Sequence, residues 1–110
     1  MKIFLQAACV GSLFLASGFA RAEEVGKIEL GHAYALQHCA ECHAVEGADE
    51  MSPNVDAPNF TIVANTKGMT ARALAVWLVT SHPTMPNLMI GAEDRDNVIA
   101  YITSLREKRE

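Results

Sequence analysis

Apolar residues recur with the spacing of an α-helix in three stretches of the chain. These stretches cover residues 23–37, 71 to about 80, and 92–108. In the last of them Val98, Tyr101, Ile102 and Leu105 stand at i, i+3, i+4 and i+7, which predicts one buried stripe. No stretch has the pattern of a β-strand. We therefore predict an all-α domain with about three main helices.

The polar residues at the helix ends agree with this prediction. Glu23 and Glu24 suit the N-terminus of the first helix, and Thr70 is a good N-cap for the second. The third begins with Glu93, Asp94 and Asp96 and ends near Lys108 and Arg109, which matches the helix dipole. The face predicted for the first helix comprises Ile28, Gly31, Tyr34 and Ala35, and that of the second comprises Leu74, Trp77 and Leu78.

Two positions on these faces suggest close packing. Gly31 lowers helix stability relative to alanine, but a glycine there would let another helix approach closely. Trp77 is the only tryptophan, and a single tryptophan on a helix face most often packs in the core.

Two long loops are expected between the helices. Residues 44–66 contain repeated Gly, Pro and Asn and no apolar periodicity, so we predict a loop that wraps around another object, with Phe60 and Ile62 in the core. Residues 81–91 form a second loop, which Pro83 and Pro86 interrupt.

The N-terminus resembles a targeting segment. Lys2 precedes an apolar stretch over residues 3–20, which ends in the A-x-A pattern Ala20-Arg21-Ala22. We expect residues 1–22 to be a signal peptide and residues 23–110 to be the mature domain, located in the bacterial periplasm. The alternative is an uncleaved membrane anchor, although the polar and small residues in the stretch weaken it for that role.

The charge balance limits the possible partners. The chain has 9 basic and 13 acidic residues, and removal of Lys2 and Arg21 with the signal peptide would leave a formal charge of −6. Such a protein is a poor candidate for binding nucleic acid or an anionic membrane. We expect a monomer that meets partner proteins through their positive or apolar faces.

Cys39-Ala40-Glu41-Cys42-His43 carries the chemistry of the chain. C-x-x-C-H is the attachment signature of c-type haem, in which two thiols form thioethers to the porphyrin vinyl groups. The following histidine, His43, can then ligate the iron. A redox dithiol or half of a zinc site is the alternative, but the βαβ context and the second pair of ligands that these would need are absent from the sequence.

The second axial ligand of such an iron could come from the loop over residues 81–91. Met85 precedes Pro86 in a stiff segment that suits the presentation of a thioether, with Met89 as the next choice and His82 as a bis-histidine rival. His32 and His38 are expected to face the solvent. Pro53 is the candidate to offer a backbone carbonyl to the other ring nitrogen of His43.

In this order of elements the chain resembles the class I cytochromes c, in particular the small soluble periplasmic ones of bacteria. The resemblance spans the mature chain. It implies the cytochrome c fold around one covalent haem c, attached at Cys39 and Cys42, with His43 and Met85 as iron ligands and Pro53 bracing His43. It also implies that the terminal helices cross where Gly31 meets Tyr101. The aromatic residue usual at position 35 is replaced by Ala35, and the lysine ring of mitochondrial members is missing.

The resemblance implies a one-electron carrier that exchanges electrons with redox partner proteins, and not an enzyme. The alternative is a haem subunit, small haem enzyme or sensor in which the methionine dissociates, so that the iron binds a substrate or a gas. A colourless dithiol protein without haem is a third reading, in which His43 and the Met85-Pro86 segment would have no purpose.

Overall fold

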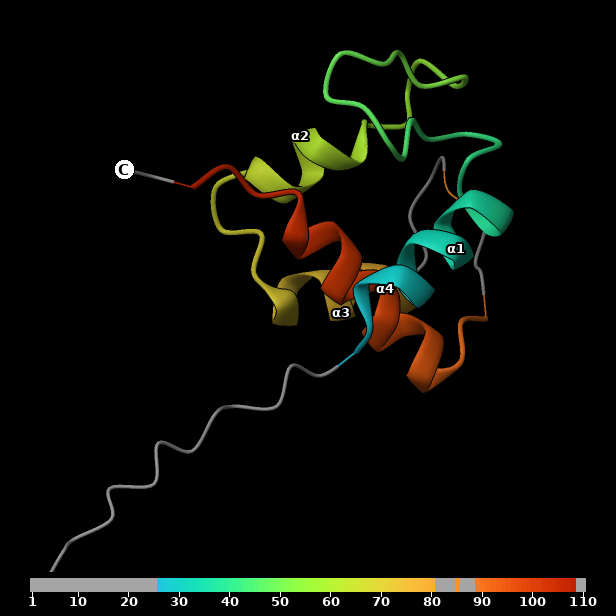
Figure 1. The fold of residues 1–110 in the computed structure, drawn as a ribbon, viewed down its shortest axis with the longest axis vertical. Coiled ribbons are helices and arrows are strands. Elements are labelled where there is room, and N and C mark those ends of the chain that lie inside the picture. The colour runs from blue at the N-terminus through green and yellow to red at the C-terminus, as the bar shows by residue number, and fades with distance from the viewer. Residues whose placement is uncertain (1–25, 81–84, 86–88, 109–110) are drawn as a thin grey trace, which may run out of the picture.

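The protein is helical throughout the part of the chain that the structure describes. The structure, a computed structural model, describes residues 26–80, 85 and 89–108. In these residues it contains α1 (Ile28–His38), α2 (Phe60–Asn65), α3 (Ala71–Val79) and α4 (Ala92–Ser104), and no strand (Figure 1). The predicted all-α class is confirmed. The expected signal peptide and His82 lie outside the described residues.

The first helix begins later than the sequence suggested. Gly26 has a φ of 105°, which is outside the helical range, and Lys27 is the N-cap of α1. The backbone N–H of Lys27 donates a 2.7 Å hydrogen bond to Oδ1 of the buried Asn97 on α4. This bond holds the chain in a non-helical turn, so the prediction of a helix is wrong at residues 26 and 27, and its first residues, 23–25, lie outside the described residues.

Helices α1 and α4 pack against each other at Gly31 (Figure 1). A Cβ atom built on Gly31 would overlap the backbone carbonyl of Asn97 and would lie 2.8 Å from the Cβ of Tyr101. Only a glycine allows this approach, so the predicted contact between Gly31 and Tyr101 is present. The predicted stripe on α4 is also found: Val98, Tyr101 and Ile102 are buried, and Leu105 packs partly against the core.

The short helix α2 was not predicted. It lies within the stretch that the sequence analysis assigned to a loop, and it begins directly after Asn59. The side chain of Asn59 accepts a 2.7 Å hydrogen bond from the N–H of Thr61, which caps the helix. Phe60 is buried as expected, but Ile62 is on the outer side of α2 and 60% exposed, so its assignment to the core was wrong.

The other two helices agree better with the sequence. Helix α3 starts after Thr70, whose hydroxyl accepts a hydrogen bond from the N–H of Ala73 as predicted. Helix α4 stops at Ser104, four residues before the predicted end. Beyond it Arg106 donates to the carbonyl of Ala64 in α2 and to that of Met69 after α2. These bonds hold the segment after Ser104 in a non-helical path, so the helix does not continue. No helix in the described residues is long and apolar enough to cross a membrane.

Candidate haem-binding site

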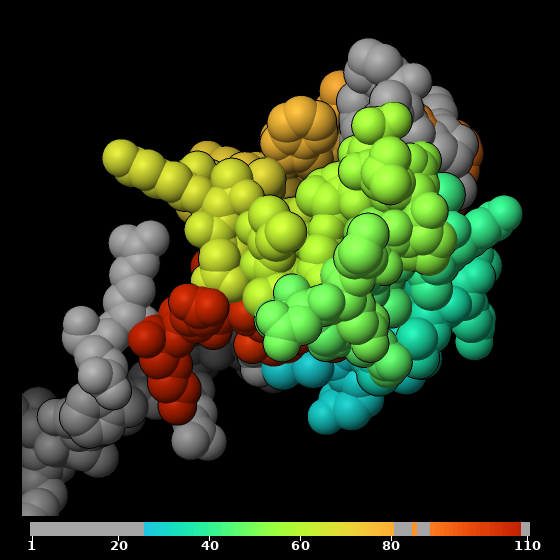
Figure 2. Space-filling model, turned by 90° about the horizontal axis from the view of Figure 1, so that it is seen from above, coloured from blue at the N-terminus to red at the C-terminus, as the bar shows by residue number. Residues whose placement is uncertain are grey.

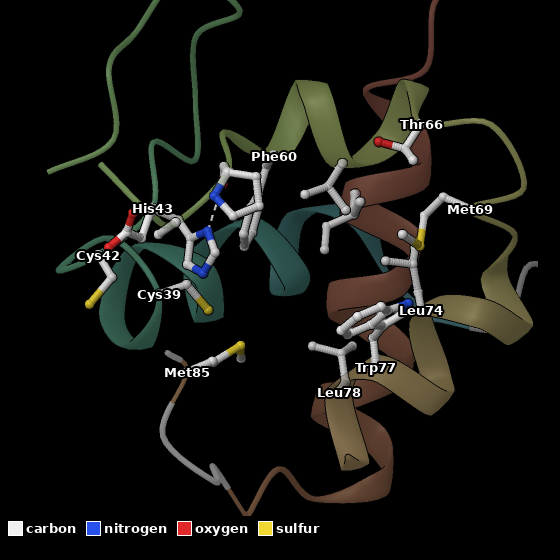
Figure 3. A pocket seen from close by; sticks show the side chains of 15 residues that line it. Cys39, Cys42, His43, Phe60, Thr66, Met69, Leu74, Trp77, Leu78 and Met85 are labelled. Carbon is white, nitrogen blue, oxygen red and sulfur yellow. Dashed lines mark hydrogen bonds between the residues drawn. The ribbon is translucent and has the colours of Figure 1, made fainter. Parts of the chain in front are cut away.

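The described part of the chain encloses a largely apolar cavity of about 280 Å³ (Figure 3). Its walls come from the end of α1, the loop before α2, and the inner faces of α2, α3 and α4. Apolar side chains on these helices that line it include Phe60, Val63, Leu74, Leu78 and Ile102. Cys39, Cys42, His43 and Met85 also line this cavity, so all four residues predicted to hold a haem come together there.

The cysteines lie on the turn that ends α1. Cys39 is the C-cap of the helix, and its N–H donates a 2.8 Å hydrogen bond to the carbonyl of Ala35. The N–H groups of Cys42 and His43 donate to the carbonyl of Cys39 at 3.1 and 2.9 Å. This tight turn brings three reactive side chains to one cavity. Neither thiol forms a disulfide; Cys39 is buried and Cys42 is half-buried.

A backbone carbonyl fixes the imidazole of His43. Its Nδ1 lies 2.6 Å from the carbonyl oxygen of Pro58, and the ring packs at 5.2 Å from that of Phe60 (Figure 3). A carbonyl only accepts hydrogen bonds, so Nδ1 is the donor and Nε2 keeps its lone pair for a metal. The carbonyl was predicted to come from Pro53. That prediction is wrong, because the loop returns to His43 only at Pro58.

Asn59 holds the returning loop, and the sequence analysis gave it no role. Its Nδ2 donates to the carbonyls of Gly47 at 2.6 Å and Glu50 at 2.9 Å, while its Oδ1 caps α2. The side chain is 5% exposed. Because Asn59 follows Pro58 directly, these three bonds also position the carbonyl that holds His43. An asparagine just before the apolar residues Phe60, Val63 and Ala64 was the N-cap signal that could have revealed it.

Three methionines can be compared as axial ligands. Met85 lines the cavity on the same side as His43 and the cysteines, whereas Met69 lines it further away, near Thr66 and Leu74 (Figure 3). Met89 is 94% exposed and does not line the cavity. The geometry therefore favours Met85 over Met89.

The remaining residues singled out in the sequence lie around the site. Trp77 contributes to the cavity wall from α3, but it is 51% exposed and is not part of the buried core. Tyr101 is buried, and its hydroxyl donates to the carbonyl of Val45 in the loop. His38 is exposed as predicted, whereas His32 is only half-exposed: its Nε2 lies 2.8 Å from Glu46, and its ring packs at 4.8 Å from that of Tyr101.

The thiol of Cys39 lacks the lowered pKa of an attacking thiol in a redox dithiol. Burial, and to a smaller extent the neighbouring Cys42, raises the pKa of the Cys39 thiol to about 11. Reactive dithiols instead have a lowered pKa, since the thiolate is the nucleophile. Among the described residues there is also no group of three or more His, Cys, Asp or Glu side chains arranged to hold a metal ion.

This set of donors suits a covalently bound haem. Two thiols lie next to a histidine whose Nε2 is available, a thioether lines the same cavity, and the walls are apolar enough for a porphyrin. Cys39 and Cys42 would form the thioethers, and His43 and Met85 would approach the iron.

Comparison with known proteins identifies a relative of the chain. The chain is 31% identical over 107 residues to cytochrome c-552 of Bradyrhizobium diazoefficiens, and the alignment covers 96% of this chain and 99% of that protein. No protein-family model and no solved structure matches the chain significantly. The chain belongs to the small c-type cytochromes, electron-transfer proteins that carry a covalently bound haem c.

Proposed function

We propose that the protein is a periplasmic one-electron carrier in which Cys39 and Cys42 attach the haem and His43 and Met85 ligate its iron. The observation that carries this proposal is the convergence of these four side chains on one apolar cavity. When bound, the haem supplies an iron that alternates between the ferric and ferrous states. Histidine and methionine together favour a high reduction potential.

The protein's own residues would keep the iron environment constant during electron transfer. The carbonyl of Pro58 holds the imidazole of His43 in one orientation and one tautomer. Apolar side chains such as Phe60 and Leu74 exclude water from the cavity. A site that does not rearrange when the charge changes suits repeated electron exchange, and we assign no catalytic residue to it.

The location and partners form part of the same proposal. The signal-peptide pattern of residues 1–22 supports export, with residues 23–110 as the mature, monomeric domain. Export places the cysteines in an oxidising compartment, where haem attachment would consume both thiols. A donor and an acceptor protein are then required, and the acidic chain supports partners with positive or apolar contact faces.

Replacement of the axial methionine tests the ligand assignment. Met85→Ala should lower the reduction potential by on the order of 100 mV, within the ~0.8 V range over which axial ligands act. The variant should also bind carbon monoxide when reduced, whereas the parent protein should not. Optical spectra and a redox titration of the haem-loaded protein would measure both effects.

Met89→Ala is the matched control, because its side chain is 94% exposed. It should leave the potential and the spectrum unchanged. If Met69→Ala or Met89→Ala opened the iron to carbon monoxide and Met85→Ala did not, the assignment of Met85 would be refuted. Rapid binding of carbon monoxide by the parent protein would instead support a haem enzyme or a sensor.

A further inference from the structure

The loop between α1 and α2 presents two large apolar side chains to the solvent. Met51 is 86% exposed and Val55 is 85% exposed. Leaving side chains of this kind in water forgoes the free energy that their burial would contribute. Single exposed apolar residues are common, but here two of the three most exposed large apolar residues in the described part of the chain lie on one loop.

Hydrogen bonds to the rest of the protein fix the backbone of this loop. The buried Nδ2 of Asn59 donates to the carbonyls of Gly47 and Glu50, and the Ser52 hydroxyl accepts a 3.0 Å hydrogen bond from the N–H of Ala44. Further along, the N–H of Asn54 donates at 3.1 Å to the carbonyl of Cys42. Met51 and Val55 are therefore displayed by a fixed loop, which lowers the entropy cost of binding a partner.

The charged residues of the loop itself are all acidic, and one of them, Glu46, lies 2.8 Å from Nε2 of His32 on α1. Glu46, Asp49, Glu50 and Asp56 are all exposed on the same loop. No lysine or arginine occurs anywhere from residue 28 to residue 66. The lysines and arginines of the described residues lie outside this loop: Lys27 precedes α1, Lys67 and Arg72 lie near α3, Arg95 is on α4, and Arg106 and Lys108 follow α4. The face formed by residues 46–56, the acidic loop face, is therefore apolar in part and negative around it.

The acidic loop face adjoins the candidate haem site. The bond from Asn54 to Cys42 ties the loop to the attachment motif, and Asp56 contributes to the cavity wall. Figure 2 looks down on this region, where the loop, drawn in green, forms much of the face turned toward the viewer. A protein bound here would lie close to the His43 side of the cavity.

We propose that the acidic loop face is the docking surface for a redox partner protein whose contact face is apolar and bordered by lysine or arginine. An apolar centre with a charged border suits a small, quickly exchanging interface, and opposite charges speed the encounter. This inference rests on the proposed function and adds to it the place of docking and the charge of the partner.

The test uses the haem-loaded protein and mitochondrial cytochrome c, a small redox protein with a ring of lysines, as the probe. The ¹⁵N-labelled reduced protein is titrated with unlabelled reduced probe, and amide shifts are followed by NMR at ionic strengths of about 10 and 300 mM, where the Debye length falls from ~30 Å to below 10 Å. Shifts should saturate at low ionic strength and should concentrate in residues 46–56.

Two pairs of variants separate charge from apolar contact. Asp49→Asn/Glu50→Gln should weaken binding about 5-fold or more at low ionic strength, and the effect should shrink in high salt. Its control, Glu93→Gln/Asp94→Asn on α4, changes the net charge equally and should alter the affinity by less than ~2-fold. Met51→Ser/Val55→Ser should weaken binding at both ionic strengths, because apolar contact is not screened, whereas Ile62→Ser should not.

The outcomes separate this inference from the proposed function. A normal low-spin c-type spectrum with shifts centred on α3, or with no saturable shifts at low ionic strength, would overturn the docking surface alone. Equal weakening by both charge variants would overturn it too, since only net charge would then matter. Loss of the c-type spectrum in the parent protein would contradict the proposed function itself, whatever the shift map shows.

Discussion

At the scale of single residues, the phenol of Tyr101 joins α4 to the loop that follows His43. Its hydroxyl donates to the carbonyl of Val45, and both residues are buried. Tyr101→Phe would leave that buried carbonyl without this donor. At pH 7 the change should lower the free energy of unfolding by about 1–2 kcal/mol, measured by urea denaturation of the haem-loaded protein.

The effect of Tyr101→Phe should depend on pH in a defined direction. Burial, followed by the charges of Glu46 and Glu50, raises the pKa of the Tyr101 phenol above its usual value of 10.0. A group whose pKa is raised on folding stabilises the protein fully below its unfolded pKa, and this contribution is lost as the pH rises through the folded value. The difference in the free energy of unfolding between the parent protein and Tyr101→Phe should therefore become smaller above about pH 10.

Tyr34→Phe provides the matched control for this measurement. The pKa of Tyr34 is also raised, mainly by burial, but this phenol is only partly buried. Its loss should cost less than ~1 kcal/mol at pH 7. A gap between the parent and Tyr101→Phe that stayed constant from pH 7 to pH 11 would contradict the assigned role of the Tyr101 phenol.

Single residues also show which contacts could be predicted from the sequence and which could not. Gly31 and Tyr101 could be paired from the resemblance, because only a glycine fits so close a helix crossing. The carbonyl that meets His43 could not be placed, since Pro53 and Pro58 have the same backbone chemistry. The choice between them depends on where the loop turns back, which is decided by hydrogen bonds between residues far apart in the sequence.

At the scale of elements, Asn59 connects the loop to the start of α2. Asn59→Ala removes a helix cap and two bonds to loop carbonyls, so it should lower the free energy of unfolding by about 3 kcal/mol. Asn59→Ser retains a hydroxyl that can cap α2, and it should cost about 2 kcal/mol. Chemical denaturation of the haem-loaded proteins would measure both values.

Spectroscopic measurements distinguish a role of Asn59 in positioning the carbonyl of Pro58 from a general loss of stability. If the loop places Pro58, both Asn59 variants should shift the NMR signals of the His43 ring and change the reduction potential. Asn54→Ala, which removes the acceptor of one local bond to the N–H of Asp56, is the control and should change neither. If Asn59→Ser were as stable as the parent protein, the bonds from Asn59 to the loop carbonyls would contribute nothing, and only the cap of α2 would matter.

The elements themselves were predictable to different degrees. Helices α3 and α4 begin where their caps and acidic first turns indicated, because these signals are local. The start of α1 and the end of α4 differ from the prediction. Lys27 and Arg106 make hydrogen bonds to other elements, and these bonds compete with further helical turns. The short α2 was missed because six residues are too few to show a helical period.

At the scale of the whole molecule, the site takes the place of a large part of the core. Apolar side chains from α2, α3 and α4 face a cavity of about 280 Å³, and Trp77 on its wall is half-exposed. A domain of this size buries a smaller fraction of the surface of its unfolded chain than a large domain does, so it has little stability to spare. The haem should therefore complete the core as well as carry the electron.

Protein without haem should consequently be largely unfolded. Cys39→Ala/Cys42→Ala, which cannot form the thioethers, should show weak helical circular dichroism and no cooperative thermal transition when it is purified free of haem. Binding of a cofactor to the native state alone stabilises it by mass action, and a covalent bond makes that contribution permanent. A haem-free preparation with the helical content of the parent protein and a sharp melt would show that the helices pack without the cofactor, and the cavity would then be a preformed pocket.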